Sequence, residues 1–107
     1  MPRDAVGHYE WVRIYIECCR LFENLAGGWR SDAKHQAFAL ANWASAVQDT
    51  SKEFASLRTA MASLIDFSLT WEERIRPLAK HMPWLEKRVI ESTRSEHTES
   101  GTSSAGL

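Results

Sequence analysis

The sequence predicts an all-α protein: an antiparallel helical hairpin with one very long helix, a short C-terminal helix and a disordered tail. Apolar residues recur at three- and four-residue spacing over most of the chain, which is the period of a helix. No run alternates like a β-strand between turn residues. Gly27-Gly28 and Pro77 separate the periodic stretches. The chain has 107 residues, enough for one modest core, so residues 1–91 are expected to form a single helical domain.

The first expected helix spans Asp4 to Ala26. Its polar residues recur at alternating spacings of three and four, which draws one solvated stripe along the helix. The opposite side is apolar and broad, so this helix is expected to bury more than one flank, as in a bundle. The polar stripe contains Glu10, Arg13, Glu17, Arg20 and Asn24, and the apolar side is marked by Trp11, Tyr15, Cys18, Phe22, Leu25 and Trp29.

The pair Gly27-Gly28 is expected to end the first helix and to form a turn with Trp29. Glycine adopts the left-handed conformation of helix C-caps and weakens a helix interior by about 1 kcal/mol relative to alanine. After the turn, Ser31 or Asp32 can accept hydrogen bonds from the free backbone N–H groups that open the next helix.

A single heptad stripe predicts the second helix, from Asp32 to Arg76. Thr50 and Glu53 have the spacing of a capping box, a motif of helix starts, so two collinear helices are the alternative to one very long helix. The stripe stays in phase across this joint, which favours a continuous or gently kinked helix. Its members are Leu40, Trp43, Val47, Thr50, Phe54, Leu57, Met61, Leu64, Ser68, Trp71 and Ile75.

Pro77 is expected to end the long helix, because proline lacks a backbone N–H and disfavours the helical conformation of the residue before it. Pro83 is compatible with the first turn of a helix, so a short third helix is expected from Pro83 to about Glu91. Residues 92–107 hold almost no apolar side chain that could offset the entropy cost of ordering. They are expected to form a disordered polar tail.

Composition places the chain among ordinary globular proteins, with 44% apolar and 25% charged residues. No run approaches the roughly 20 apolar residues of a membrane span, and a net charge of -1 gives no global field that favours nucleic acid or anionic lipid. Cys18 and Cys19 are adjacent and cannot form a framework of loop-closing disulfides. The default compartment is therefore the cytoplasm. Secretion would be signal-less, because the N-terminal segment lacks the signal-peptide pattern.

The residue types used in catalysis and metal binding are scattered. Adjacent helical residues such as Cys18 and Cys19 point about 100° apart and have no Cys or His at ligand spacing nearby, which favours buried structural thiols. The four histidines show no His-x-x-x-His spacing. The carboxylates Glu72, Glu73 and Glu86 lie among basic residues that would pair with them rather than raise their pKa values. We therefore expect no enzyme activity, no metal site and no cofactor.

Basic residues gather around the segment from Pro77 to Pro83. Lysine and arginine contact phosphates, so this run is a candidate site for the phosphates of RNA or lipid, and it is the phosphate-binding set of the alternative function, binding of double-stranded RNA. Neighbouring glutamates largely neutralise the charge, which favours a solvated helix end instead. The phosphate-binding set is Arg74, Arg76, Lys80, Lys87 and Arg88, and the neutralising glutamates are Glu72, Glu73, Glu86 and Glu91.

Five tryptophans are many for so short a chain. Two interpretations stay open: packing in the core, and an aromatic stripe on the long helix that contacts another subunit. The second predicts a non-catalytic protein–protein interaction module, most simply a homodimer of two hairpins that closes a four-helix-like core by pairing the long helices through a coiled-coil-like seam. The expected interface residues are Trp43, Val47, Phe54, Leu57 and Met61.

The segment Leu25-Ala26-Gly27-Gly28-Trp29-Arg30-Ser31-Asp32-Ala33, followed by Phe38, resembles the turn of WXG-type secreted helical hairpins. The resemblance implies antiparallel helices joined at a Trp-x-Gly turn, a dimer, and export without a signal peptide. Ser31 stands where that family has glycine, and the family's export signal, a Tyr followed four positions later by Asp or Glu, is absent. By size and long-helix layout alone, the chain is also similar to small viral helical dimers that bind double-stranded RNA and suppress silencing.

Overall fold

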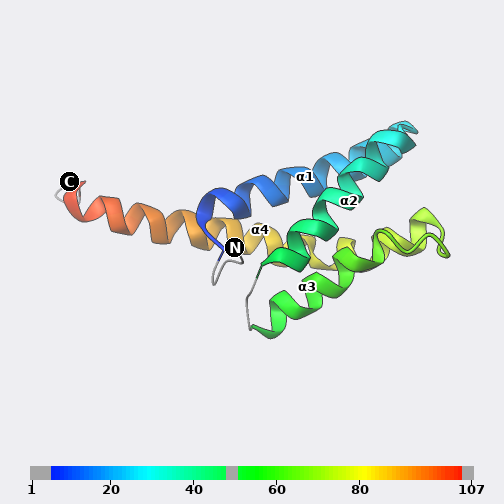
Figure 1. Ribbon diagram of the computed structural model, residues 1–107. Helices are drawn as coiled ribbons and strands as arrows, with labels where there is room; N and C mark the ends of the chain where they lie inside the picture. Colours follow the sequence, from blue (N-terminus) through cyan, green and yellow to red (C-terminus); the bar gives the residue numbers. More distant parts are fainter. Residues whose placement is uncertain (1–5, 48–50, 105–107) are drawn as a thin grey trace.

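The computed structural model describes residues 6–47 and 51–104, with side chains described as far as Arg94. These residues contain no strand, so the predicted all-α class is confirmed. Figure 1 shows how the later turns of the last helix extend past the N-terminal end of the first. Within the described ranges the chain forms four helices, which are α1 (His8–Gly27), α2 (Arg30–Ala46), α3 (Lys52–Ser63) and α4 (Trp71–Ser104).

Each helix packs against two neighbours, so the four helices close a ring around one core. Helix α1 contacts α2 and α4, and α3 contacts the same two helices (Figure 1). The chain therefore completes by itself the four-helix arrangement that the sequence assigned to a pair of hairpins. Every helix supplies fully buried side chains, among them Cys18, Leu21, Leu40, Leu57, Met61, Leu78 and Leu85.

The expectation of one very long helix from Asp32 to Arg76 is wrong. Helix α2 ends at Ala46, Val47 is extended, and Ser51 begins α3 by accepting a hydrogen bond from the backbone N–H of Phe54 at 3.1 Å. The break turns α3 back against α2, which buries the apolar stripe of both helices inside one chain. The predicted capping residue Thr50 lies outside the described residues, and the observed cap is its neighbour Ser51.

Pro77 does not end a helix as predicted, because a new helix has already begun before it. Thr70 and Glu73 form a reciprocal capping box at the start of α4: the Glu73 N–H donates to Thr70 Oγ1 at 3.1 Å, and the Thr70 N–H donates to Glu73 Oε1 at 3.0 Å. Pro77 and Pro83 both lie inside α4. Leu78 and Leu85 are fully buried beside the prolines, and such packing offsets the lost backbone hydrogen bonds.

Helix α4 also continues beyond Glu91, where the short third helix was expected to end. The Ser92 hydroxyl lies 3.0 Å from His8 Nδ1, so the first residue assigned to the polar tail contacts α1. The helix runs through Ser104, and residues 105–107 of the predicted tail lie outside the described residues.

Two arginines hold the ends of helices whose carbonyl groups lack helical partners. Arg58 of α3 donates from Nε to the Ala44 carbonyl at 3.1 Å and from Nη2 to the Val47 carbonyl, at the end of α2. Arg74 of α4 donates to the carbonyls of Leu69 at 3.1 Å and Leu64 at 3.5 Å, after the end of α3. Cations at these positions satisfy the terminal carbonyls and the negative end of the helix dipole.

The turn between α1 and α2 forms at the predicted residues. Gly28 has φ 83°, in the left-handed region, and its N–H donates to the Leu25 carbonyl, while the Trp29 N–H donates to the Asn24 carbonyl at 2.8 Å. These bonds form the Schellman motif of a helix C-terminus. Helix α2 then begins at Arg30 without a side-chain cap, so neither Ser31 nor Asp32 caps it as expected.

We expect Gly28→Ala to lower the free energy of unfolding by about 1 kcal/mol, because a Cβ atom disfavours the left-handed conformation. Gly27→Ala is the matched control: Gly27 is helical, and its new Cβ would meet only the exposed Trp29 ring at 3.3 Å. Urea denaturation followed by circular dichroism measures both variants. Equal stability of the two would contradict the assignment of the left-handed cap to Gly28.

We expect Arg74→Met to lower the free energy of unfolding by about 2 kcal/mol, because it leaves the buried Leu64 carbonyl and the partly buried Leu69 carbonyl without their charged donor. Arg74 is the buried charged side chain of the described residues, with 8% exposure. The control is Arg76→Met, which removes only an exposed ion pair with Glu72 and should cost less than about 0.5 kcal/mol. Similar losses for both variants in the same denaturation assay would show that Arg74 does not hold the end of α3.

Candidate functional site

An aromatic cluster joins all four helices at one level of the bundle. The Trp11 ring of α1 lies 6.3 Å from Trp43 of α2, 6.3 Å from Phe54 of α3 and 5.7 Å from Trp84 of α4, between ring centroids. The interplanar angles of 73°, 68° and 83° are those of edge-to-face packing. Trp11 is 5% exposed, and Trp43 and Trp84 pack against the core around it. These three tryptophans are therefore core residues.

The predicted interface residues belong to this core and are not presented to a partner. The exposed fractions of Val47 and Phe54 are 1%, and those of Leu57 and Met61 are 0%. Trp43 is partly buried against the same cluster. The apolar stripe that was predicted to contact a second subunit packs inside the same chain, because α3 folds back and contacts both α2 and α4.

The predicted phosphate-binding residues do not form a common basic surface. Arg74 is buried under the α3–α4 connection, and Arg76 pairs with Glu72 at 3.3 Å. Arg88 lies over the rings of Trp11 and Trp84 and pairs with Glu91 at 3.5 Å. Lys80 and Lys87 remain exposed on α4. Three of the five cations are thus engaged within the fold, which reduces the charge available for a duplex.

The described His, Cys, Asp and Glu residues do not gather in a metal-binding cluster. No group of three or more His, Cys, Asp or Glu side chains within the described ranges is arranged to hold a metal ion. His81 contacts the Pro77 carbonyl at 2.8 Å, and His8 contacts Ser92. Cys18 is fully buried, and burial raises the pKa of its thiol to about 12. Cys19 is partly exposed beside it.

The two thiols should differ sharply in reactivity, because the thiolate is the reactive species and burial suppresses it in Cys18. With Ellman's reagent at pH 8, we expect Cys19 to react in the folded protein and Cys18 to react only after denaturation. Cys19→Ser should abolish the fast phase, whereas Cys18→Ser should keep it. Fast labelling in the Cys19→Ser variant would contradict the burial of Cys18.

Exposed apolar side chains mark the outer face of α1, on the side opposite to its core residues Trp11, Ile14, Cys18 and Leu21. Tyr9 is 86% exposed and Ile16 is 44% exposed, and Val12 lies between them with partial exposure. The sequence interpretation assigned this broad apolar surface to a second buried flank, and the structure leaves it without a neighbour among the described helices. A shallow groove of about 330 Å³ follows this face and is lined by Tyr9, Val12, Arg13, Ile16, Glu17 and Arg20.

Comparison of the chain with protein-family models, with curated proteins and with solved structures finds no match. No helix of the described residues combines the length and the apolar character needed to cross a bilayer.

Proposed function

We propose that this protein is a non-catalytic helical interaction module that associates with another protein, most simply a second copy of itself, through the outer face of α1. The observation that carries the proposal is the exposed apolar strip Tyr9–Val12–Ile16, which follows helical spacing on the side of α1 away from the core. An apolar strip along one helix is the form of surface that another helix covers.

The charges beside the strip support a second copy as the partner. Arg13 and Glu17 flank the strip and pair with each other at 3.6 Å within the chain. When two identical helices pack antiparallel about a twofold axis, the same flank of each helix faces that of the other in reversed order. Arg13 of each copy then lies near Glu17 of the other, so the flank is complementary to itself.

The proposed association is weak, because the core of the single chain already buries most of the apolar surface. Because most of the large apolar side chains are buried within one chain, the interface draws on a few side chains of one helix. Such a small interface lies at the weak end of specific association. We therefore propose a reversible dimer rather than an obligate one.

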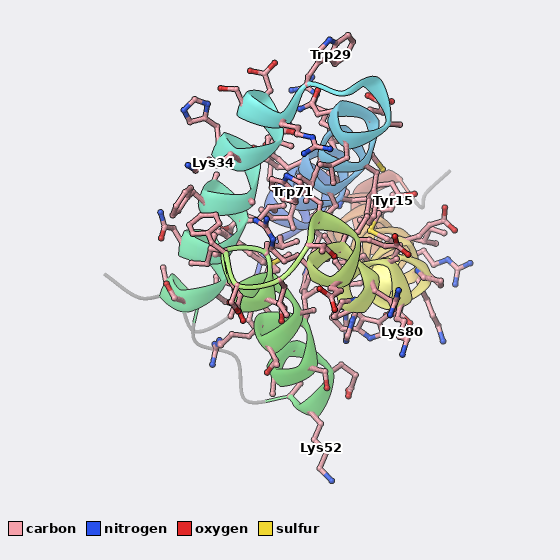
Figure 2. The ribbon with its side chains drawn as sticks, turned by 90° about the vertical axis from the view of Figure 1, so that its right-hand side faces the viewer. Tyr15, Trp29, Lys34, Lys52, Trp71 and Lys80 are labelled. Carbon is pink, nitrogen blue, oxygen red and sulfur yellow. The ribbon has the colours of Figure 1, made fainter. Side chains whose placement is uncertain are left out.

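The WXG-type resemblance adds a more specific form of the proposal, a small effector exported without a signal peptide. It is supported by the position of Trp29, which lies in the turn between two packed helices, α1 and α2. Figure 2 shows Trp29 at the end of this hairpin, with its side chain directed away from the bundle. Its exposed fraction of 61% makes it a surface residue of the turn.

We expect the wild-type protein to form dimers in sedimentation-velocity experiments, with a dissociation constant of roughly 10–100 µM, as for a weak interface. Ile16→Glu should weaken the dimer by at least about tenfold, because it places a charge on the apolar strip. Ala55→Glu adds the same charge on an exposed face of α3 and should leave the dimer unchanged.

A wild-type monomer at all accessible concentrations, or equal dimerisation of the Ile16→Glu variant, would refute self-association through α1. Gel-shift titration with duplex RNA at two salt concentrations tests the alternative function in parallel. Tight binding that falls steeply with salt would favour RNA binding over protein association.

A further inference from the structure

A second surface feature lies away from the α1 strip, where the first turns of α2 meet the connection between α3 and α4. It is a hollow of about 400 Å³. Figure 2 shows Lys34 on α2 and Trp71 at the start of α4 on this side of the molecule. The residues that line the hollow are Arg30, Ser31, Lys34, Phe67, Trp71 and Arg74.

The hollow is positively charged. Three of its six lining residues are cationic, and none carries a carboxylate. Asp66 lies next to a lining residue in sequence, but its carboxylate accepts hydrogen bonds from the Ser68 hydroxyl at 2.6 Å and from the Ser68 N–H at 3.1 Å. These bonds, followed by the charge of Arg74, lower the pKa of Asp66. Asp66 is not among the lining residues, so the cations converge without a carboxylate in the wall of the hollow, which favours an anion there.

The hollow also has an aromatic wall. Phe67 is 56% exposed, and both Lys34 Nζ and Arg74 Cζ lie 5.2 Å from its ring centroid. The Trp71 ring lies 4.0 Å from Arg74 Cζ. Phe38 supports Phe67 from α2, with 5.7 Å between the ring centroids. Phe67 and Trp71 thus form an aromatic wall beside the cations, with Phe67 largely exposed and Trp71 packed in part against the core.

Arg74 lines the hollow, and its guanidinium group is held in place while one of its nitrogen atoms keeps its hydrogen-bond donors available. Its Nε and Nη1 atoms donate to the carbonyls of Leu69 and Leu64, and the two aromatic rings hold the guanidinium plane. Among the described residues, Nη2 has no hydrogen-bond acceptor at bonding distance. A guanidinium that is held in place loses little entropy when it binds a carboxylate or phosphate.

We propose that this hollow binds a small organic anion that carries a flat apolar ring. The carboxylate or phosphate group lies between Lys34 and Arg74, with Arg30 at the rim, and the ring stacks against Phe67 and Trp71. Placing an anion between two like charges relieves their repulsion, and the aromatic wall selects for an attached ring over a bare ion. This binding site is independent of the proposed dimer surface on α1.

The test is a titration of the full-length ¹⁵N-labelled protein with four probes, followed by ¹H–¹⁵N NMR. Phenyl phosphate and benzoate carry both ring and charge, inorganic phosphate carries the charge alone, and benzyl alcohol carries the ring alone. The Trp71 indole signal, assigned with Trp71→Phe, should shift with phenyl phosphate or benzoate. Either of these should bind at least about tenfold more tightly than phosphate or benzyl alcohol. Comparison of the first two probes shows which anion the site prefers.

Lys34→Gln should weaken the binding of phenyl phosphate or benzoate by several-fold, because it removes one of the two central cations. Lys34 is exposed, so this variant keeps the core intact, and unchanged melting verifies that. Lys52→Gln, on the distant end of α3, is the matched control and should bind as the wild type does (Figure 2).

Three results would overturn the proposal. The first is the absence of any Trp71 shift at about 10 mM of every probe, well above the range of specific small ligands. The second is equal affinity for inorganic phosphate and phenyl phosphate, which would indicate adventitious binding of an ion to surface charge. The third is an equal loss of affinity in Lys34→Gln and Lys52→Gln. None of these results depends on whether the protein forms a dimer through α1.

Discussion

The packing of Trp11 against one aromatic ring from each of the other three helices is the contact on which the rest of the fold depends. Trp43, Phe54 and Trp84 all lie within 6.3 Å of the Trp11 ring. Removing a buried tryptophan typically costs 3–5 kcal/mol, a large part of the roughly 5–15 kcal/mol that stabilises a small domain. Because the partners come from residues far apart in the sequence, this cluster fixes the order of the helices around the core as well as its stability.

The same closure requires helices to end inside the bundle, and two arginines make these ends possible. Arg58 reaches from α3 to the last carbonyls of α2, and Arg74 reaches from α4 to the carbonyls after α3. A buried carbonyl without a donor costs about 1–3 kcal/mol, so each break would be unfavourable without its arginine. Arg74 stabilises the fold and also lines the cationic hollow, which links the connection between α3 and α4 to the proposed anion site.

The sequence predicted the local features of the fold better than its topology. The all-α class, the first helix to within a few residues, and a left-handed glycine in the pair Gly27-Gly28 follow from periodicity and glycine chemistry, and the structure assigns the positive φ to Gly28. The prediction of one long helix was wrong, because two separate helices that face the same core produce the same in-phase heptad stripe as one continuous helix. The capping box at Thr70 and Glu73 was present in the sequence and identifies the start of α4, which explains why Pro77 lies inside a helix.

The candidate sites were harder to predict, because both depend on which apolar and charged residues the core leaves unused. Ile16 and Phe54 are equally apolar, and only the packing of α3 shows that the second is buried and the first exposed. Lys34 and Arg74 are forty positions apart in the sequence and share one hollow because α2 and α4 meet the α3–α4 connection there. Pattern analysis of single segments cannot detect such a pair.

Because the core closes within one chain, association of this protein with a partner is not coupled to its folding. In a hairpin that needs a partner to bury its seam, dimerisation and folding are one event, and the dimer cannot exchange without unfolding. Here the aromatic cluster and the capped helix ends complete the core with side chains of a single chain. The free energy of the proposed α1 interface is therefore separate from that of the fold. An interface of this kind can form and dissociate while both partners stay folded, so its strength responds to concentration and to charge at its flanks.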